Sequence, residues 1–174
     1  MQTTIRQLEQ IVIDYTAQLQ QLSEKEFSFK PAPAKWSRKE VLGHLIDSAQ
    51  TNIRRFVIAQ YEDKPKIVYA QDTWVIAANY QNYPATDLIA LWVLLNKHIC
   101  IVLKNMPAGA AGKEVLTQKL HTVKWLAADY NKHLLHHLHV LLNLEPAAPS
   151  GIFLSTIQIC LLSKTHNAIK SVGG

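Results

Sequence analysis

The sequence contains little cysteine: Cys100 and Cys160 are the only two in its 174 residues. They lie in the apolar stretches "HICIVL" and "IQICLL", and no CxxC motif occurs. A zinc knuckle or a dithiol redox site needs closely spaced cysteine pairs, so the sequence excludes both kinds of site. We expect both thiols to be free and buried in apolar surroundings.

Charged residues are also scarce, at 18% of the chain, and the formal net charge is +5. No run of Lys and Arg is longer than the pair Arg54-Arg55, whereas a protein that binds nucleic acid concentrates basic residues on one face. Nucleic acid is therefore not an expected partner. The 13 Asp and Glu residues leave few carboxylates that could serve as metal ligands.

The sequence also lacks signs of a membrane or secreted protein. No apolar run approaches the roughly 18 residues that a membrane-spanning helix needs. The N-terminal stretch "MQTTIRQLEQIVIDY" does not resemble a signal peptide, because it carries Glu9 and Asp14 and has no basic start followed by an apolar block. We expect a cytoplasmic protein that does not contact a membrane, with residues 1–174 forming one domain.

Helical patterns dominate what is present. Ser37 and Glu40 have the S-x-x-E spacing of a capping box, which marks a helix start in the segment 35–61. Because every strong pattern has the helical period, we predict an all-α four-helix bundle with its core at about residues 4–144. The other three expected helices span about Thr4–Leu22, Thr86–Met106 and Thr122–Leu144.

Two connections between these helices are long. Residues 63–84 are expected to be functional or to contain a short helix in "QDTWVIAANY". Residues 107–120 include "AGAAG", which is typical of a flexible turn. Residues 145–174 form a short extra C-terminal segment, which we expect to pack against the bundle or a neighbouring subunit, or alternatively to cover the site.

The stretch "DYNKHLLHHLHVLL" carries four of the eight histidines. Helical spacing places His133 and His137 on the same face, one turn apart, whereas His136 shares only part of that face and His139 points away. Apolar residues on the same face indicate that the pair faces inward. Two buried imidazoles need partners, which favours either a metal ion or hydrogen-bonding neighbours.

A metal site needs a third ligand from elsewhere in the chain. His44 is flanked by apolar residues in the helix that follows Ser37, and we prefer it to His98, whose neighbours are more polar. Other sites are less consistent with the sequence: H-E-x-x-H and E-x-x-H are absent. A Ser-His-Asp triad stays open, but no G-x-S-x-G motif supports it.

Two segments resemble a known family. "KWSRKEVLGHLIDSAQTNIRRF" is similar to the signature helix of the DinB/YfiT superfamily, and "WLAADYNKHLLHHLHVLL" is similar to its later helix, which ends in H-x-x-x-H. The phrases "YAQDTWV" and "LIALWVLLNKHICIVLKNMP" also resemble the middle of this family. The resemblance covers about residues 5–144, and the segment after Glu145 has no counterpart in it.

The resemblance implies a metal held by His44, His133 and His137, with nickel or zinc as the expected ion. It also implies a bundle of unusual connectivity and a homodimer. Family members include enzymes that act with thiols, so the resemblance suggests a small-molecule substrate and a low-molecular-weight thiol such as bacillithiol as cosubstrate.

These observations favour a metal-dependent thiol transferase or hydrolase. The alternatives are a non-catalytic, dimeric metal-binding bundle in a stress-related or sensor role, and a histidine-lined bundle without metal. Asp47 and Asp129 are candidates to accept an imidazole N–H from a ligand, because they lie three residues after His44 and four before His133. The further candidates for the pocket or the substrate anchor are Tyr130, Asn52, Gln71, Asp72, Trp74, Arg54 and Arg55.

Overall fold

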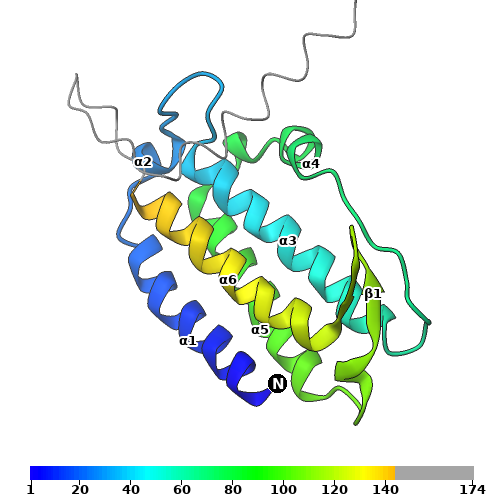
Figure 1. Ribbon diagram of the computed structural model, residues 1–174. Helices are drawn as coiled ribbons and strands as arrows, with labels where there is room; N and C mark the ends of the chain where they lie inside the picture. Colours follow the sequence, from blue (N-terminus) through cyan, green and yellow to red (C-terminus); the bar gives the residue numbers. More distant parts are fainter. Residues whose placement is uncertain (144–174) are drawn as a thin grey trace, which may run out of the picture. The chain divides into compact units, whose positions relative to one another are not determined.

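The computed structural model describes residues 1–143, which form a four-helix bundle (Figure 1). The bundle helix α6 packs against α1 and α3, and α5 packs against the same two helices from the other side. The predicted four-helix architecture is confirmed. The four helices are α1 (Gln2–Leu19), α3 (Arg38–Ile58), α5 (Ala85–Lys104) and α6 (Val123–Leu142).

The connection between α3 and α5 determines the unusual chain path. Figure 1 shows it returning along the bundle from the end of α3, so that α3 and α5 run parallel while α3 and α6 run antiparallel. The connection contains the expected short helix, α4 (Gln71–Ala78), followed by the 3₁₀ turn η1 (Tyr80–Asn82). Asn79 ends α4 in the left-handed region with φ 56°, a conformation that asparagine adopts more readily than most residues.

The first helix is shorter than predicted. α1 ends at Leu19, and a separate short helix α2 (Glu24–Ser28) follows instead of one helix to Leu22. The reason is a second capping box: Ser23 accepts from the Glu26 backbone N–H, and the Glu26 side chain accepts from the Ser23 backbone N–H. These bonds start a new helix because they satisfy backbone donors that have no partner within it. The predicted capping box of Ser37 and Glu40 is confirmed at the start of α3.

The connection between α5 and α6 contains a β-hairpin that the sequence patterns did not indicate. A 3₁₀ turn, η2 (Ala110–Gly112), precedes strands β1 (Glu114–Leu116) and β2 (Leu120–Thr122), which pair antiparallel with Val115 opposite His121. The Ile67 backbone N–H donates to the Leu116 carbonyl at 3.0 Å, which attaches the α3–α4 connection to the hairpin. Thr122 ends the hairpin and caps α6 through the Trp125 backbone N–H.

Among the described residues, α5 is the one helix long and apolar enough to cross a membrane, with a mean hydropathy of 1.6. The expectation drawn from the sequence concerned an uninterrupted apolar run, and α5 contains none of that length, because Asn96, Lys97 and His98 interrupt it. In the bundle, α5 packs against α1 and α3 and buries Leu88, Trp92, Ile99 and Leu103. This packing accounts for much of the apolar character of α5.

Cys100 is free and buried, as expected. The predictions made for Cys160 and for residues 145–174 lie outside the described residues.

Candidate metal centre

Three imidazoles converge between α3 and α6. His44 comes from α3, and His133 and His137 come from α6. One ring nitrogen from each lies within 4.8 Å of those of the other two. The Nε2 atoms of His44 and His133 are 3.0 Å apart. The structure therefore brings together the same three histidines that the spacing and the resemblance selected.

The convergence follows from helix geometry and helix direction. Because α3 and α6 are antiparallel neighbours, the first half of α3 faces the second half of α6 (Figure 1). The 3.6-residue period directs His133 and His137 to the same side of α6, with their ring centroids 4.5 Å apart. On α3, every residue from Arg38 to Ala49 except Glu40 is buried, so His44 has no route to solvent and is 0% exposed.

All three imidazoles are held in their neutral form. Burial lowers the pKa of His44 to about 4, of His133 to about 4 and of His137 to about 3. The neighbouring histidines lower the pKa of His137 and His44 further, because positive charges on adjacent rings would repel one another. Neutral imidazoles are the form that binds metal, since each then offers a nitrogen lone pair.

The hydrogen bonding around the three rings is sparse. Ser48 Oγ lies 3.5 Å from His133 Nδ1, and the Trp36 ring lies beside His44 with a centroid distance of 5.5 Å. His44 Nδ1 is buried and has no hydrogen-bond partner among residues 1–143. Within the described part of the chain, the ring contacts of His137 are with His44, His133 and His136.

This donor set fits a divalent metal ion. Two nitrogens bound to one tetrahedral ion at about 2.0–2.1 Å would be about 3.3 Å apart, so a small shift from the His44–His133 distance of 3.0 Å would accommodate the ion. The same 3.0 Å distance also suits an N–H···N hydrogen bond between the two rings. Without an ion, buried neutral rings would meet with few hydrogen-bond donors for their lone pairs. Imidazole ligands suit zinc, nickel, copper and iron more than magnesium or calcium.

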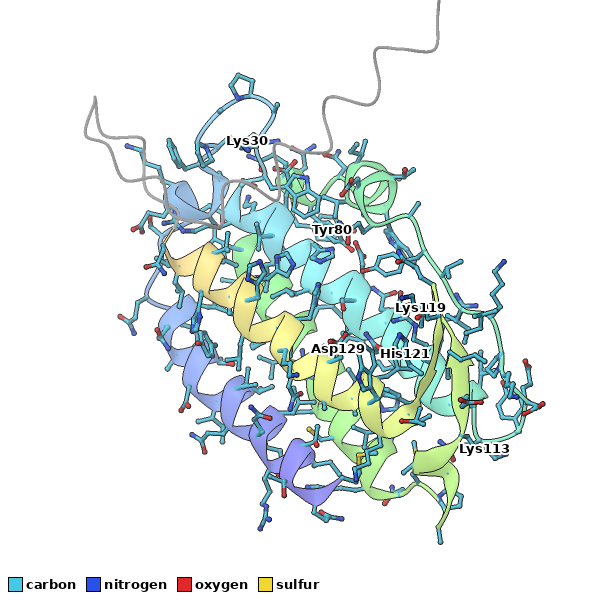
Figure 2. The ribbon with its side chains drawn as sticks, in the orientation of Figure 1. Lys30, Tyr80, Lys113, Lys119, His121 and Asp129 are labelled. Atoms are coloured by element: carbon cyan, nitrogen blue, oxygen red, sulfur yellow. The ribbon has the colours of Figure 1, made fainter. Side chains whose placement is uncertain are left out.

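A buried carboxyl lies one turn after His44. Asp47 is 0% exposed, and its Oδ1 accepts a hydrogen bond from the hydroxyl of Tyr80 in η1. Tyr80 is labelled in Figure 2. Asp47 Oδ2 has no partner among the described residues. Burial raises the pKa of Asp47 to about 6, and the bond from Tyr80 opposes that rise. The same burial, together with Asp47, raises the pKa of Tyr80.

Gly43 allows Tyr80 to occupy this position. The aromatic ring lies directly against the backbone of α3 at Gly43, and a Cβ atom there would come closer than 3.0 Å to three carbon atoms of the ring. The absence of a side chain at position 43 therefore brings the Tyr80 hydroxyl within reach of Asp47.

A cavity of about 430 Å³ lies beside His133, which forms part of its wall. Its walls come from α3, the residues after Ile67, the β-hairpin and α6. The size is typical of pockets for small molecules. His133 is the one member of the three-histidine cluster in its lining. The polar lining residues include Ser48, Asn52, Arg55, Tyr69, Gln71, Lys119, His121, Asp129 and Tyr130.

Of the further residues predicted for the pocket or the ligand orientation, some line the cavity and others do not. Asp129 is exposed and lines the cavity. It makes no hydrogen bond to His133 within residues 1–143, although its charge raises the pKa of that ring. The Tyr130 hydroxyl is buried and donates to Asn96 Oδ1 at 2.7 Å. Asn52, Gln71 and Arg55 line the cavity, whereas Asp72, Trp74 and Arg54 do not.

The remaining described histidines do not belong to the cluster. His98, the competing third ligand, is exposed on α5. His136 and His139 are exposed on α6, and His121 stacks on Trp125 with ring centroids 3.7 Å apart. His166 lies outside the described residues.

Sequence reasoning missed Ser48, Tyr80 and Gly43. Ser48 could have been found, because it lies four residues after His44 on the same face of an expected helix. Tyr80 carries no such signal, since it lies in an irregular connection whose path depends on tertiary packing. Gly43 lies inside a helical pattern, so the sequence does not show why glycine is needed there. The need arises from the Tyr80 ring, which packs against the backbone at this position.

The lowered histidine pKa values predict a loss of stability in acid for the metal-free protein. Between pH 6.5 and about 4, an unfolded chain protonates its histidines while these three stay neutral in the fold, so falling pH lowers the free energy of unfolding. Asp47 opposes this, because its raised pKa favours the fold as pH falls from about 6 to 3.8, but it is one group against three.

Proton NMR of the histidine C–H signals, recorded with thermal unfolding at several pH values, checks this expectation. Three histidine signals should stay at their neutral shifts at pH 5. A variant with the exposed His98 replaced by glutamine should keep the same dependence of unfolding on pH, because His98 lies on α5 outside the three-histidine cluster. Titration of all histidine signals near pH 6.5 would contradict the expectation.

The chain is similar to proteins of one known family. The model of the DinB superfamily matches residues 7–141. No curated protein matches the sequence. The structure is similar to YfiT from Bacillus subtilis, described as a probable metal-dependent hydrolase with an unusual four-helix bundle topology, with a TM-score of 0.73 and 17% identity over 80% of this chain and 82% of YfiT.

Two structures of a mycothiol-dependent maleylpyruvate isomerase are also similar. Their TM-scores are 0.70 and 0.64, at 13% and 16% identity. The matches cover 83% and 84% of this chain but 61% of the isomerase chains, so this chain spans about three fifths of their length. At these identities the structural likeness shows a shared fold. The family match over residues 7–141 identifies the protein as a member of the DinB superfamily.

Proposed function

We propose that the protein is a divalent-metal-dependent enzyme that carries out thiol transfer or hydrolysis on a small molecule. The observation that carries the proposal is the cluster of the buried His44 with the partly buried His133 and His137, with one nitrogen of each within 4.8 Å of the others. Zinc and nickel are the proposed metals, since three neutral imidazoles suit both ions.

Three protein ligands are the number found in many catalytic zinc sites, where further positions are open to water or substrate. A divalent ion at this cluster would supply Lewis acidity that lowers the pKa of a water molecule or of a thiol. The three histidines would hold the ion and stay neutral at pH 7. They need not transfer protons.

The surrounding residues have orienting roles in this proposal. Ser48 is placed to restrain the His133 ring from its Nδ1 side, and Trp36 packs beside His44. The ligand rings would thereby keep a constant orientation, which strengthens metal binding. Asp47, held by Tyr80, is a buried carboxyl on the same helix as His44 whose pKa of about 6 allows it to hold or release a proton near neutral pH.

The cavity favours an enzyme over a non-catalytic metal-binding bundle. Its volume of about 430 Å³ could accept a small molecule, and His133 forms part of its wall. A purely structural metal site would need no cavity beside a ligand. The likeness to YfiT and to the mycothiol-dependent isomerase supports the same choice, as both are described as enzymes.

Two measurements test this proposal. Elemental analysis of protein purified without a histidine tag, before and after incubation with zinc or nickel, should give about one ion per chain. A thiol-consumption assay should then pair bacillithiol, glutathione or coenzyme A with a generic electrophile, with and without metal.

Metal-dependent thiol consumption would support the transferase. Binding of metal without turnover of any thiol would favour a hydrolase or the non-catalytic bundle, which a panel of ester and amide substrates would distinguish. A protein that binds no stoichiometric divalent ion would contradict the whole proposal.

A further inference from the structure

The cavity beside His133 contains the guanidinium group of Arg55, which forms no direct ion pair with a carboxylate of the described residues. Burial lowers the pKa of Arg55, and the charge of Asp129, which lines the same cavity, opposes that change. Arg55 on α3 is half-buried and lines the cavity. The ion pairs among the described residues involve four lysines, and none involves Arg55. A half-buried cation without a direct ion pair is unfavourable, and such groups are often found where a protein binds an anion.

Neighbouring groups hold Arg55 in place without using all of its donors. Nε and Nη2 donate to the Ile67 carbonyl at 3.2 and 3.1 Å, and Nη1 donates to Asn52 Oδ1 at 3.3 Å. Asn52 is itself anchored, because its Nδ2 donates to the Ser48 carbonyl at 2.9 Å. A guanidinium has five N–H donors, so one N–H on each terminal nitrogen is left over. Two adjacent N–H groups are suited to a bidentate carboxylate.

The rest of the cavity is consistent with an organic anion. Lys119 adds a second positive charge from the hairpin, and Asp129 is the one acidic residue among the described residues of the lining. Figure 2 shows Lys119, His121 and Asp129 near one another beside the hairpin. Trp125 is 47% exposed and stacks on His121, so it offers an aromatic surface in the cavity wall. The exposed residues of this wall would leave a ligand a route from solvent.

We propose that the cavity binds a small organic carboxylate, with its acid group paired to the two remaining N–H groups of Arg55. The body of the ligand would lie along the wall formed by Trp125 and reach toward His133. The anion site itself needs no metal. The further step, that the bound carboxylate is the substrate or part of it, rests on the proposed function.

The test uses the full chain, treated with chelator and dialysed so that no metal can bind the probes. Calorimetry and ligand-observed NMR would measure binding of benzoate and succinate, with benzamide and succinamide as neutral matched probes and inorganic phosphate as a competing anion. The variants are Arg55→Gln and Arg55→Lys. Arg54→Gln is the matched control, because Arg54 is the adjacent residue, is exposed and lies outside the cavity lining.

We expect at least one carboxylate to bind at least tenfold more tightly than its amide. Arg55→Gln should abolish that preference, Arg55→Lys should retain part of it, and Arg54→Gln should leave it unchanged. Comparison of acid with amide on the unsubstituted chain stays decisive even if Arg55→Gln unfolds. No carboxylate binding, equal binding of acid and amide, preference for phosphate, or retained preference in a folded Arg55→Gln variant would overturn the proposal.

The same protein, titrated with zinc or nickel, separates this inference from the proposed function. Carboxylate binding that depends on Arg55 in a chain that binds no metal would uphold the anion site and contradict the metal-dependent enzyme. Metal binding without carboxylate binding would contradict the anion site and leave the metal-dependent enzyme supported.

Discussion

Replacing His137 by alanine is expected to lower the affinity for zinc or nickel by more than about 100-fold, because even residues that only orient a metal ligand contribute about 10- to 100-fold. His137 would supply one of three nitrogen ligands, and its ring lies 4.7 Å from the ring of His44 and 4.5 Å from that of His133. Competition with a chromogenic chelator would measure the affinity of the variant and of the parent protein.

His136→Ala is the matched control for this substitution. His136 precedes His137 in the same helix and carries the same side chain, but it is exposed and lies outside the three-histidine cluster. Its ring contacts that of His137 at a centroid distance of 5.0 Å, so we expect a loss of metal affinity below about tenfold, the effect of a residue that only orients a ligand. Equal losses for both variants would indicate a site that uses the whole histidine-rich stretch, and no loss for His137→Ala would contradict the assigned ligands.

Replacing Gly43 by alanine is expected to lower the free energy of unfolding by about 3 kcal/mol, the upper range for overpacking a core. The new methyl group would overlap the Tyr80 ring, which cannot move away without breaking its hydrogen bond to Asp47. Asp47 would then be a buried carboxyl with no hydrogen-bond partner at either oxygen among the described residues. Thermal unfolding should show a melting temperature lower by about 6–12 °C.

Gly112→Ala is the control for the loss of a glycine. A Cβ atom at Gly112 meets nothing within 4 Å, so that change should be close to neutral. A double-mutant cycle with Tyr80→Ala isolates the clash: Gly43→Ala should cost much less when the ring at position 80 is absent. If Gly43→Ala is as mild as Gly112→Ala, or equally costly with and without the ring, then close packing of Tyr80 on α3 is not the reason for glycine at position 43.

Much of the fold could be predicted because helical signals are local. A capping box needs residues three positions apart, so Ser37 and Glu40 marked the start of α3 correctly. The same motif at Ser23 and Glu26 was available and was overlooked, which made the first predicted helix too long. The hairpin gave little signal, since each strand has three residues and its pairing depends on packing against the α3–α4 connection.

The candidate metal centre could likewise be predicted only in part from the sequence. The pairing of His133 with His137 follows from the period of one helix, and the sequence by itself determined it. Sequence reasoning could only prefer His44 as the third member, through its apolar neighbours and a family resemblance. Its Nε2 lies 3.0 Å from that of His133, 89 positions later in the chain, because α3 and α6 run antiparallel in contact.

The sequence by itself determined the helical class, the helix starts and the histidine pair, because hydrophobic period and capping act within one or two turns. Only the tertiary structure decided that Tyr80 packs on Gly43 and donates a hydrogen bond to Asp47. It also decided that Ser48 faces His133, and that Arg55 lies in a cavity lined in part by the hairpin. Each of these depends on segments far apart in the chain, whose contacts are set by the packing of the whole bundle.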